Sequence, residues 1–288
     1  MRIAFFSTKP YDRIWFEPMA KDYGYEIHFI ELPFSEETMF LANGYDAVCI
    51  FVNDQVNGRM IDYLSENKVK ALLLRSAGYN HVDVKAAKGK IAVLRVPSYS
   101  PEAVAEFAMA MLLTVNRFTH KAYGRTRDFN MNINGLMGTD LYHKVAGVIG
   151  TGKIGQAMIR IFHGFRMNVL AYDPYPNHNL DVQYVGLSEL LAKADFISLH
   201  CPLTPETHHI INEKTIAEMK EGVYLVNTSR GGLIDTQALI EGLLSKKFGG
   251  VGLDVYEEEE GLFYEDCSDE IIQDENLDDF IGTILIKQ

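Results

Sequence analysis

The sequence predicts an α/β protein with two doubly wound parallel-sheet lobes. In the first hundred residues, short apolar runs alternate with amphipathic stretches, and a second series of the same kind begins at Val145. Strands separated by helices of this length form parallel sheets with helices on both faces. A length of 288 residues is also ample for two domains, because most domains hold roughly 100 to 200 residues.

The first lobe is expected to occupy residues 1–99. Helical patterns fall between its apolar runs, so we expect helices on both faces of its sheet. The predicted strands are Ile3–Ser7, Glu26–Ile30, Ala47–Val52, Val69–Leu74 and Ile91–Val96.

A long helix is predicted to begin at Ser98-Tyr99-Ser100-Pro101-Glu102 and to run to about Phe118. This segment offers a serine as the cap, proline at the first helical position and a glutamate in the first turn. The helix is apolar nearly all round, which suggests burial between the two lobes. We place the crossover between domains here.

The second lobe is expected to span residues 100–275, followed by an atypical tail at 276–288. There is no internal repeat at a short fixed period, so a solenoid or propeller is not indicated. The predicted strands are Val145–Ile149, Asn168–Tyr172, Phe196–His200, Val223–Asn227 and Gly250–Val255.

Composition argues against several classes of partner. The chain has 27 basic and 39 acidic residues and a net charge of −12, so its field repels nucleic acid and anionic membrane surfaces. No export signal or run of about 18 apolar residues is present. Cys49, Cys201 and Cys267 are too few for a disulfide framework and too far apart for a metal motif. We therefore expect a cytoplasmic protein without a metal site.

A glycine-rich motif, Gly150-Thr151-Gly152-Lys153-Ile154-Gly155, follows the predicted strand Val145–Ile149 and precedes a helical pattern. In a dinucleotide-binding turn, Gly150 permits the tight bend, Gly152 lets the backbone approach a diphosphate, and Gly155 allows the helix to pack on the sheet. The helix N-terminus would then present free N–H groups to the phosphates. The spacing alone is weak evidence, since such glycines also mark ordinary turns.

Asp173 strengthens this interpretation. It ends the next predicted strand, 18 positions after Gly155, where a carboxylate accepts hydrogen bonds from the adenosine ribose. A carboxylate there also repels the 2′-phosphate of NADP, so NAD is the expected cofactor. The alternative is a surface aspartate at a strand end.

Five further blocks of the sequence have a recognisable pattern: Arg75-Ser76-Ala77-Gly78-Tyr79-Asn80, Val96-Pro97-Ser98-Tyr99-Ser100-Pro101, Ile197–Thr207, Leu225–Gly232 and Gly252–Glu259. Together with the glycine motif they resemble the D-isomer-specific 2-hydroxyacid dehydrogenase family, in particular its D-lactate dehydrogenase subgroup. The resemblance extends over about nine tenths of the chain and implies a Rossmann NAD-binding domain and a flavodoxin-like substrate domain.

The resemblance also implies roles for residues around the cofactor. Lys153 and Ile154 would lie over the diphosphate, and Cys201, Pro202 and Thr207 would line the cofactor pocket. Thr228 and Ser229 would lie beside the nicotinamide, with Asp254 near its carboxamide.

For the substrate, the resemblance implies that Arg230 holds the carboxylate and carbonyl of a small 2-keto or 2-hydroxy acid, as suits a guanidinium fork. Ala77 and Gly78 would add backbone N–H groups, and Tyr99 a hydroxyl. Glu259 would pair with the catalytic histidine and raise the pKa of that histidine. Alternatively, Glu259 belongs to a solvated turn of four glutamates.

The catalytic histidine itself has no match. In the family it follows one more strand after the acidic loop, whereas no histidine occurs after His209 in this sequence. We therefore expect a truncated or altered C-terminus, a first lobe without its usual return segment, and impaired turnover, because a general acid contributes about 10²- to 10⁴-fold. His81 is a weak alternative as the acid.

The leading hypothesis is an NAD-dependent oxidoreductase that interconverts a 2-keto acid with a D-2-hydroxy acid, with pyruvate and D-lactate as the expected pair. One alternative is a non-catalytic NAD(H)-sensing module, which the missing histidine favours. Another is a relative that acts on 2-hydroxyglutarate, phosphoglycerate or formate, since a fold does not fix its substrate. The resemblance also implies a homodimer, to which the helix from Pro101 could contribute.

Overall fold

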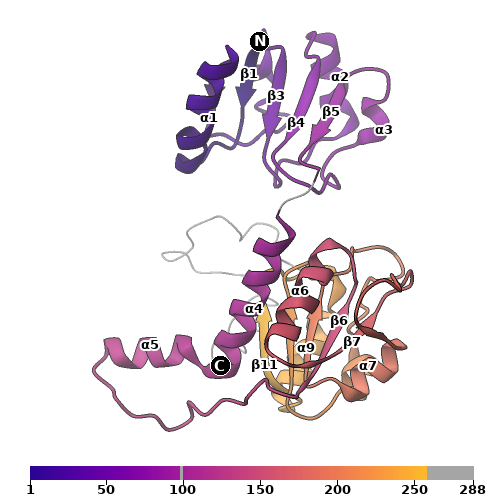
Figure 1. The fold of residues 1–288 in the computed structure, drawn as a ribbon. Helices are drawn as coiled ribbons and strands as arrows, with labels where there is room; N and C mark the ends of the chain where they lie inside the picture. Colours follow the sequence, from indigo (N-terminus) through magenta and orange to yellow (C-terminus); the bar gives the residue numbers. More distant parts are fainter. Residues whose placement is uncertain (98–99, 258–288) are drawn as a thin grey trace. The chain divides into compact units, whose positions relative to one another are not determined.

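The computed structural model describes residues 1–97 and 100–257, and it shows two α/β units (Figure 1). The first unit comprises Met1–Tyr99 and the second begins at Ser100. Each unit is built on one sheet, and all the strand pairs within these sheets are parallel. The predicted fold class, with two parallel-sheet lobes, is confirmed.

Unit 1 has a five-stranded sheet in the order β2-β1-β3-β4-β5, which is the flavodoxin-like doubly wound order. The order reverses between β1 and β3. Its elements are β1 (Arg2–Phe5), α1 (Pro10–Tyr23), β2 (Glu26–Phe29), η1 (Met39–Ala42), β3 (Ala47–Ile50), α2 (Gly58–Glu66), β4 (Ala71–Leu74), α3 (Val84–Ala87) and β5 (Ala92–Arg95).

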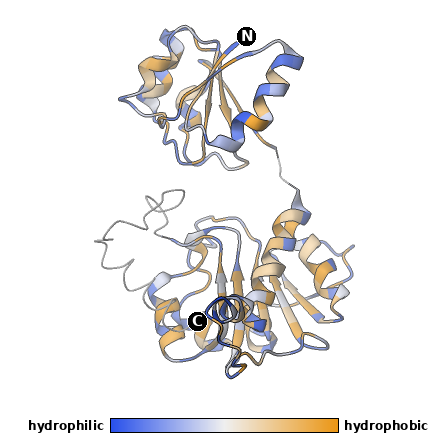
Figure 2. Cartoon of the chain, turned by 90° about the vertical axis from the view of Figure 1, so that its left-hand side faces the viewer, coloured by the Kyte–Doolittle hydropathy of each residue, from blue (hydrophilic) through white to orange (hydrophobic). Residues whose placement is uncertain are grey.

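The core of unit 1 lies on both faces of this sheet. Alternate side chains of a strand point to opposite faces, and Ile3 and Phe5 accordingly belong to one buried cluster while Ala4 and Phe6 belong to another. Hydrophobic residues run along the strands and the sheet-facing sides of the helices (Figure 2). Burial on both faces explains why these strands are nearly continuous apolar runs.

A buried ion pair fills the carboxyl edge of unit 1 at its switch point. Arg75 Nη1 lies 2.7 Å from Asp12 Oδ2, and the two side chains are only 9% and 6% exposed. The guanidinium also donates to the backbone oxygens of Phe6, beyond β1, and Ile50, in β3. It therefore bonds the ends of both strands that flank the switch point.

Unit 2 has a six-stranded sheet in the order β11-β10-β9-β6-β7-β8. Numbered along the chain, this is the Rossmann order with its switch point between β6 and β9. Its elements are α4 (Pro101–Arg117), α5 (Thr119–Arg127), β6 (Val145–Ile149), α6 (Lys153–Gly164), β7 (Asn168–Tyr172), β8 (Gln183–Tyr184), α7 (Leu187–Lys193), β9 (Phe196–Leu199), α8 (Glu213–Glu218), β10 (Val223–Asn227), η2 (Gly231–Leu233), α9 (Thr236–Leu244) and β11 (Phe248–Leu253).

The helix α4 packs within unit 2 against α6, β10 and β11. Its inward face buries Ala105, Ala108 and Leu112 completely, and the two alanines leave room for a close approach to the sheet. The Ser100 hydroxyl accepts a hydrogen bond from the Ala103 N–H at 3.3 Å, so the expected N-cap is present. Phe118, in the left-handed conformation with φ 53°, ends the helix.

The structure corrects several predicted element boundaries. The strand expected to reach Val52 ends at Ile50, because the chain turns there and the Asp54 carboxylate accepts a hydrogen bond from the Phe51 N–H at 2.7 Å. The last strand begins at Phe248, two residues before the predicted start. The short elements α5 and β8 were not predicted. Within the described residues, no helix is both long and apolar enough to cross a membrane.

Candidate functional site

The turn between β6 and α6 is built around glycine. Gly150 has φ 92°, and a Cβ there would lie 2.5 Å from the backbone nitrogen of Cys201. A Cβ at Gly155 would overlap the carbonyl oxygen of Gly150. The turn therefore needs glycine at both positions, because backbone cannot move aside as a flexible side chain can. The tight bend at Gly150 is thus as the sequence predicts, whereas the close contact at Gly155 is with the Gly150 carbonyl oxygen of the same turn.

The N-terminus of α6 is open at this turn. Gly152 is its N-cap and provides no side-chain hydrogen bond to the first turn. Among the described residues, no atom beyond the adjacent chain lies within 4 Å of a Cβ built on Gly152, and Lys153 is exposed beside it. The first N–H groups of a helix and the positive end of its dipole together bind anions. This end of α6 can therefore receive a diphosphate.

Asp173 follows β7 and faces the same turn. Its Oδ2 accepts hydrogen bonds from the Thr151 N–H at 2.7 Å and the Thr151 hydroxyl at 2.9 Å, while Oδ1 accepts from the Tyr175 N–H at 2.8 Å. Partial burial opposes ionisation, but these hydrogen bonds outweigh it and lower the pKa of Asp173. A carboxylate offers about four acceptor sites, so Asp173 can still accept from a ribose hydroxyl.

Thr151 and Tyr184, which were not predicted as site residues, hold Asp173 in place. Tyr184, in β8, donates its hydroxyl hydrogen bond to Thr151 Oγ1 at 2.9 Å, and Thr151 in turn holds Asp173. Thr151 lies within the glycine motif and could have been found there. Tyr184 has no local signal, because its role depends on the pairing of β8 with β7.

The segment after β9 contains three of the predicted cofactor residues. Cys201 is buried, and its carbonyl oxygen accepts the Ser229 hydroxyl at 2.7 Å. Burial raises the pKa of the Cys201 thiol to about 11, so this cysteine is a structural residue rather than a nucleophile. Thr207 closes its own turn by donating to the Pro202 carbonyl at 2.6 Å. The predicted cofactor-pocket residues Cys201, Pro202 and Thr207 thus lie in one short segment directly after β9.

The loop after β10 carries Thr228, Ser229 and Arg230. Asn227, fully buried, fixes it: its Oδ1 accepts from the Ser229 N–H at 3.0 Å and its Nδ2 donates to the Arg230 carbonyl at 2.9 Å. Asn227 is a positioning residue that the sequence analysis did not single out. Arg230 itself is exposed, with Nη1 donating to the Ser229 carbonyl at 2.7 Å.

Asp254 lies directly after β11 on the same edge. Its N–H donates to the Asn227 carbonyl at 3.0 Å. Neighbouring groups partly desolvate the carboxyl and raise its pKa, although the residue as a whole is exposed. Because β6, β9, β10 and β11 are parallel, their carboxyl ends meet at one edge, and this is where ligands bind in doubly wound sheets.

The remaining predicted residues lie elsewhere. Ala77 and Gly78 belong to unit 1, where the Gly78 carbonyl accepts the Ser76 hydroxyl at 2.7 Å and the Ala77 carbonyl accepts Arg95 Nη1 at 2.8 Å. His81 is also in unit 1, and burial lowers the pKa of its ring against an opposing effect of Asp54. A buried neutral imidazole is a poor general acid. Tyr99 and Glu259 lie outside the described residues.

The residues of unit 2 fit NAD on chemical grounds. The open helix end suits a diphosphate, and the Asp173 carboxylate suits a ribose. The hydroxyl oxygen of Thr228 is buried and has no hydrogen-bond partner among the described residues. An unpaired buried polar atom is costly, so a ligand group in the predicted nicotinamide region would stabilise this arrangement.

Comparisons with known proteins agree with this geometry. Residues 109–278 match the family model described as the NAD-binding domain of D-isomer specific 2-hydroxyacid dehydrogenases. The chain is 51% identical over 279 residues to the D-lactate dehydrogenase of Escherichia coli strain K12, covering 96% of this chain and 85% of that protein.

Solved structures show the same similarity. The apo structure of the Escherichia coli D-lactate dehydrogenase superposes with a TM-score of 0.85 at 51% identity, covering 89% of this chain and 83% of that one. An NAD-complexed D-isomer specific 2-hydroxyacid dehydrogenase of Lactobacillus delbrueckii ssp. bulgaricus has a TM-score of 0.82 at 30% identity, covering 98% of this chain and 87% of that one.

Proposed function

The chain belongs to the D-isomer-specific 2-hydroxyacid dehydrogenase family, whose cofactor is NAD, and on that premise we propose that it interconverts pyruvate and D-lactate. The choice of substrate rests on the relatives named D-lactate dehydrogenase at about half identity. The single observation that carries the cofactor role is the open glycine turn with Asp173 beside it.

Different residues of unit 2 bind different parts of the cofactor. Gly150, Gly152 and the first turn of α6 hold the diphosphate, and Asp173 holds the adenosine ribose. Bound NADH supplies the hydride that reduces the carbonyl carbon. Thr228 and Asp254, at the ends of β10 and β11, lie on the nicotinamide side of the pocket.

Arg230 binds and orients the substrate. Its guanidinium can hold a planar carboxylate at two points and polarise the neighbouring carbonyl. The hydrogen bonds that Asn227 makes to the loop keep this arginine at the edge of the sheet. Ala77 and Gly78 of unit 1, with Tyr99, remain proposed donors to the same carboxylate.

Reduction of the carbonyl carbon must be accompanied by protonation of the carbonyl oxygen. The resemblance assigns this proton transfer to a histidine paired with Glu259.

Calorimetric titration of the full chain with NADH tests the cofactor role, and we expect one NADH per chain. Single-turnover oxidation of that NADH by pyruvate, 2-ketoglutarate and hydroxypyruvate tests the substrate. We expect Arg230→Lys to slow the reaction with pyruvate by about 10- to 100-fold, because a charge-assisted hydrogen bond contributes about 1.5–3 kcal/mol. NADH affinity should change little.

Arg127→Lys, at an exposed position of α5, is the matched control and should behave like the original chain. Absence of NADH binding would contradict the whole proposal. NADH binding without reduction of any 2-keto acid, even at long times, would remove the dehydrogenase role and leave only a binding function.

A homodimer is a further proposal that rests on the family resemblance. Sedimentation of the full chain over a range of concentrations tests it. A species with the 32.5 kDa mass of one chain at every concentration would contradict it.

A further inference from the structure

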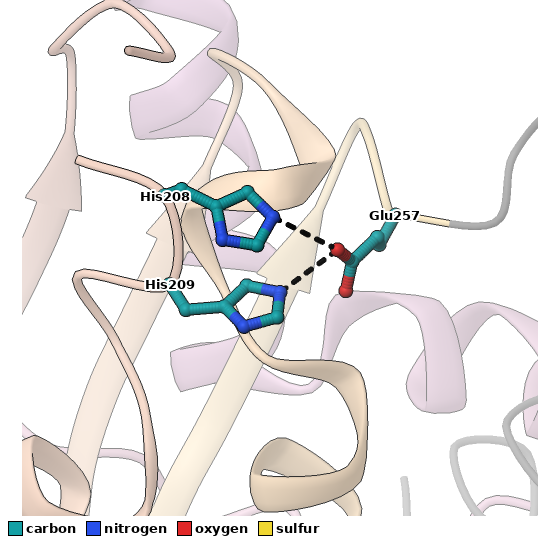
Figure 3. A group of neighbouring side chains, drawn as sticks. All are labelled: His208, His209 and Glu257. Atoms are coloured by element: carbon teal, nitrogen blue, oxygen red, sulfur yellow. Dashed lines mark hydrogen bonds and ion pairs between the residues drawn. The ribbon is translucent and has the colours of Figure 1, made fainter. Parts of the chain in front are cut away.

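Two histidines and a glutamate converge on one point of unit 2 (Figure 3). His208 and His209 follow the turn that Thr207 closes, and Glu257 follows β11. Glu257 Oε1 lies 2.8 Å from His209 Nε2 and 3.5 Å from His208 Nε2. The three potential ligand atoms all lie within 4.8 Å of one another. Neither histidine is among the residues assigned to NAD or to the substrate.

The backbone explains how two consecutive histidines face the same way. Successive side chains of an extended segment point to opposite sides. His209 instead has φ 51°, in the left-handed region, and the two imidazole rings stack with centroids 3.8 Å apart and planes inclined by 28°. The His209 N–H donates to the Gly232 carbonyl at 2.9 Å, and the His209 carbonyl accepts Asn212 Nδ2 at 2.8 Å. The conformation is therefore held from both sides.

A second carboxylate lies on the far side of His209. Asp235 Oδ2 is 3.7 Å from His209 Nδ1, and Asp235 is itself held by capping α9, with Oδ1 accepting from the Ala238 N–H at 3.0 Å. Histidines that ligate a metal usually direct their other ring nitrogen to a carboxylate, carbonyl or water. The arrangement of Asp235, His209 and Glu257 has this form.

The cluster is accessible to ions from solution. The side chains of His208, His209 and Glu257 are 52%, 30% and 29% exposed, so an ion can enter and a water molecule can occupy a remaining position. Two neutral imidazoles and one carboxylate leave a divalent ion with one positive charge, which Asp235 balances. The net charge of −12 also raises the local concentration of cations.

We propose that His208, His209 and Glu257 bind a divalent transition-metal ion, with zinc as the best fit. Two nitrogen ligands and one carboxylate with an open fourth position suit zinc, whereas magnesium and calcium prefer an all-oxygen set. The ion would join the turn after β9 to the segment that leaves β11. The proposal is independent of the dehydrogenase function.

The test uses the full chain after treatment with a chelator and dialysis. Zinc is titrated by calorimetry, and cobalt(II) by its visible absorption, which is strong for a four-coordinate site. We expect one ion per chain. His209→Gln and Glu257→Gln should each weaken binding by at least the roughly 10- to 100-fold that follows loss of an outer partner, and Asp235→Asn by about 10-fold.

Matched controls are His163→Gln and Glu213→Gln, which change exposed residues of α6 and α8 and should leave binding intact. NADH titration checks that each variant is folded. Zinc should also raise the midpoint of thermal unfolding of the original chain but not of His208→Gln. No uptake of either ion, or uptake that His209→Gln leaves unchanged, overturns the proposal and reduces the cluster to a hydrogen bond between His209 and Glu257.

Discussion

The two units differ at the same topological position: unit 1 has a buried ion pair there, whereas unit 2 has an uncapped helix N-terminus. Each is a doubly wound parallel sheet with a switch point, between β1 and β3 in unit 1 and between β6 and β9 in unit 2. In unit 1, the Arg75–Asp12 ion pair fills the position, and Asp12 also accepts from the Lys9 N–H at the start of α1 at 2.8 Å. In unit 2, the start of α6 has no side-chain cap and Gly152 borders open space.

This difference shows that the topology of the sheet provides a position where a ligand can bind, whereas the side chains determine whether that position is open. In doubly wound sheets, ligands bind outside the carboxyl ends of the strands at the switch point, and both units have such a switch point. In unit 1, the chain's own guanidinium and carboxylate satisfy the strand and helix ends. In unit 2, the N-cap Gly152 leaves the corresponding N–H groups without a side-chain cap. The following predictions test this contrast, beginning with the largest expected effect.

Arg75→Met should destabilise unit 1 by about 3–5 kcal/mol, because it leaves the buried Asp12 carboxylate uncompensated. Hydrogen exchange, read separately for residues of each unit, measures the effect. Arg59→Met is the control: its pair with Glu36 has the same 2.7 Å length but an Arg59 side chain that is 75% exposed, so its loss should change stability by less than about 1 kcal/mol. NADH affinity should be unchanged in Arg75→Met, and a large loss of it would contradict the contrast between the two units.

Gly150→Ala should abolish measurable NADH binding and destabilise unit 2 by about 1–3 kcal/mol, because the new Cβ would press on the Cys201 backbone at a left-handed φ. Gly164→Ala, at the end of α6 with nothing within 4 Å of the new Cβ, should be neutral or stabilising. NADH calorimetry and thermal unfolding distinguish the two. Retained affinity in Gly150→Ala would show that the turn does not hold the diphosphate.

Acid should weaken unit 2 through His200. Burial lowers the pKa of His200 from 6.5 to about 4, so between these values the unfolded state binds more protons than the folded state. Stability is then complete above pH 6.5 and falls as the pH falls toward 4, by at most on the order of 3 kcal/mol. His200→Gln, which can keep the hydrogen bond to Ser198, should flatten this dependence.

His81 provides the comparison in unit 1. Burial lowers the pKa of His81, and Asp54 opposes the shift. Acid should therefore destabilise unit 1 with the same sign, below the ordinary pKa of histidine. Denaturant unfolding at several pH values, followed separately in each unit, measures both. A pH profile of unit 2 that His200→Gln leaves unaltered would contradict the assignment.

Asp173→Asn should have the smallest effect, an approximately tenfold loss of NADH affinity, because the amide keeps one acceptor oxygen for Thr151 but lacks the charge. Affinity for NADPH should rise relative to NADH, since the repulsion of the 2′-phosphate disappears. Calorimetry with both nucleotides measures this, with the exposed Asp181→Asn as control. An unchanged ratio between the two nucleotides would place the ribose elsewhere.

Much of the candidate site could be predicted because its signals are local. Gly150, Gly155 and Asp173 follow from strand and helix periodicity, since a tight turn after one strand and a carboxylate after the next are features of neighbouring residues. The same locality explains the successful placement of Ser100 as a cap. The predicted end of β3 was wrong because a side chain beyond the strand turns the chain: the Asp54 carboxylate accepts a hydrogen bond from the Phe51 N–H.

The sequence by itself determined the two parallel sheets, the glycine turn and the acidic residue after β7, because each depends on patterns within a few residues. Only the tertiary structure decided which distant side chains meet. Arg75 and Asp12 are 63 positions apart, and His209 and Glu257 are 48 apart. Such pairs form when separate strands end at one edge of a sheet, and no local pattern encodes the backbone path that brings them together.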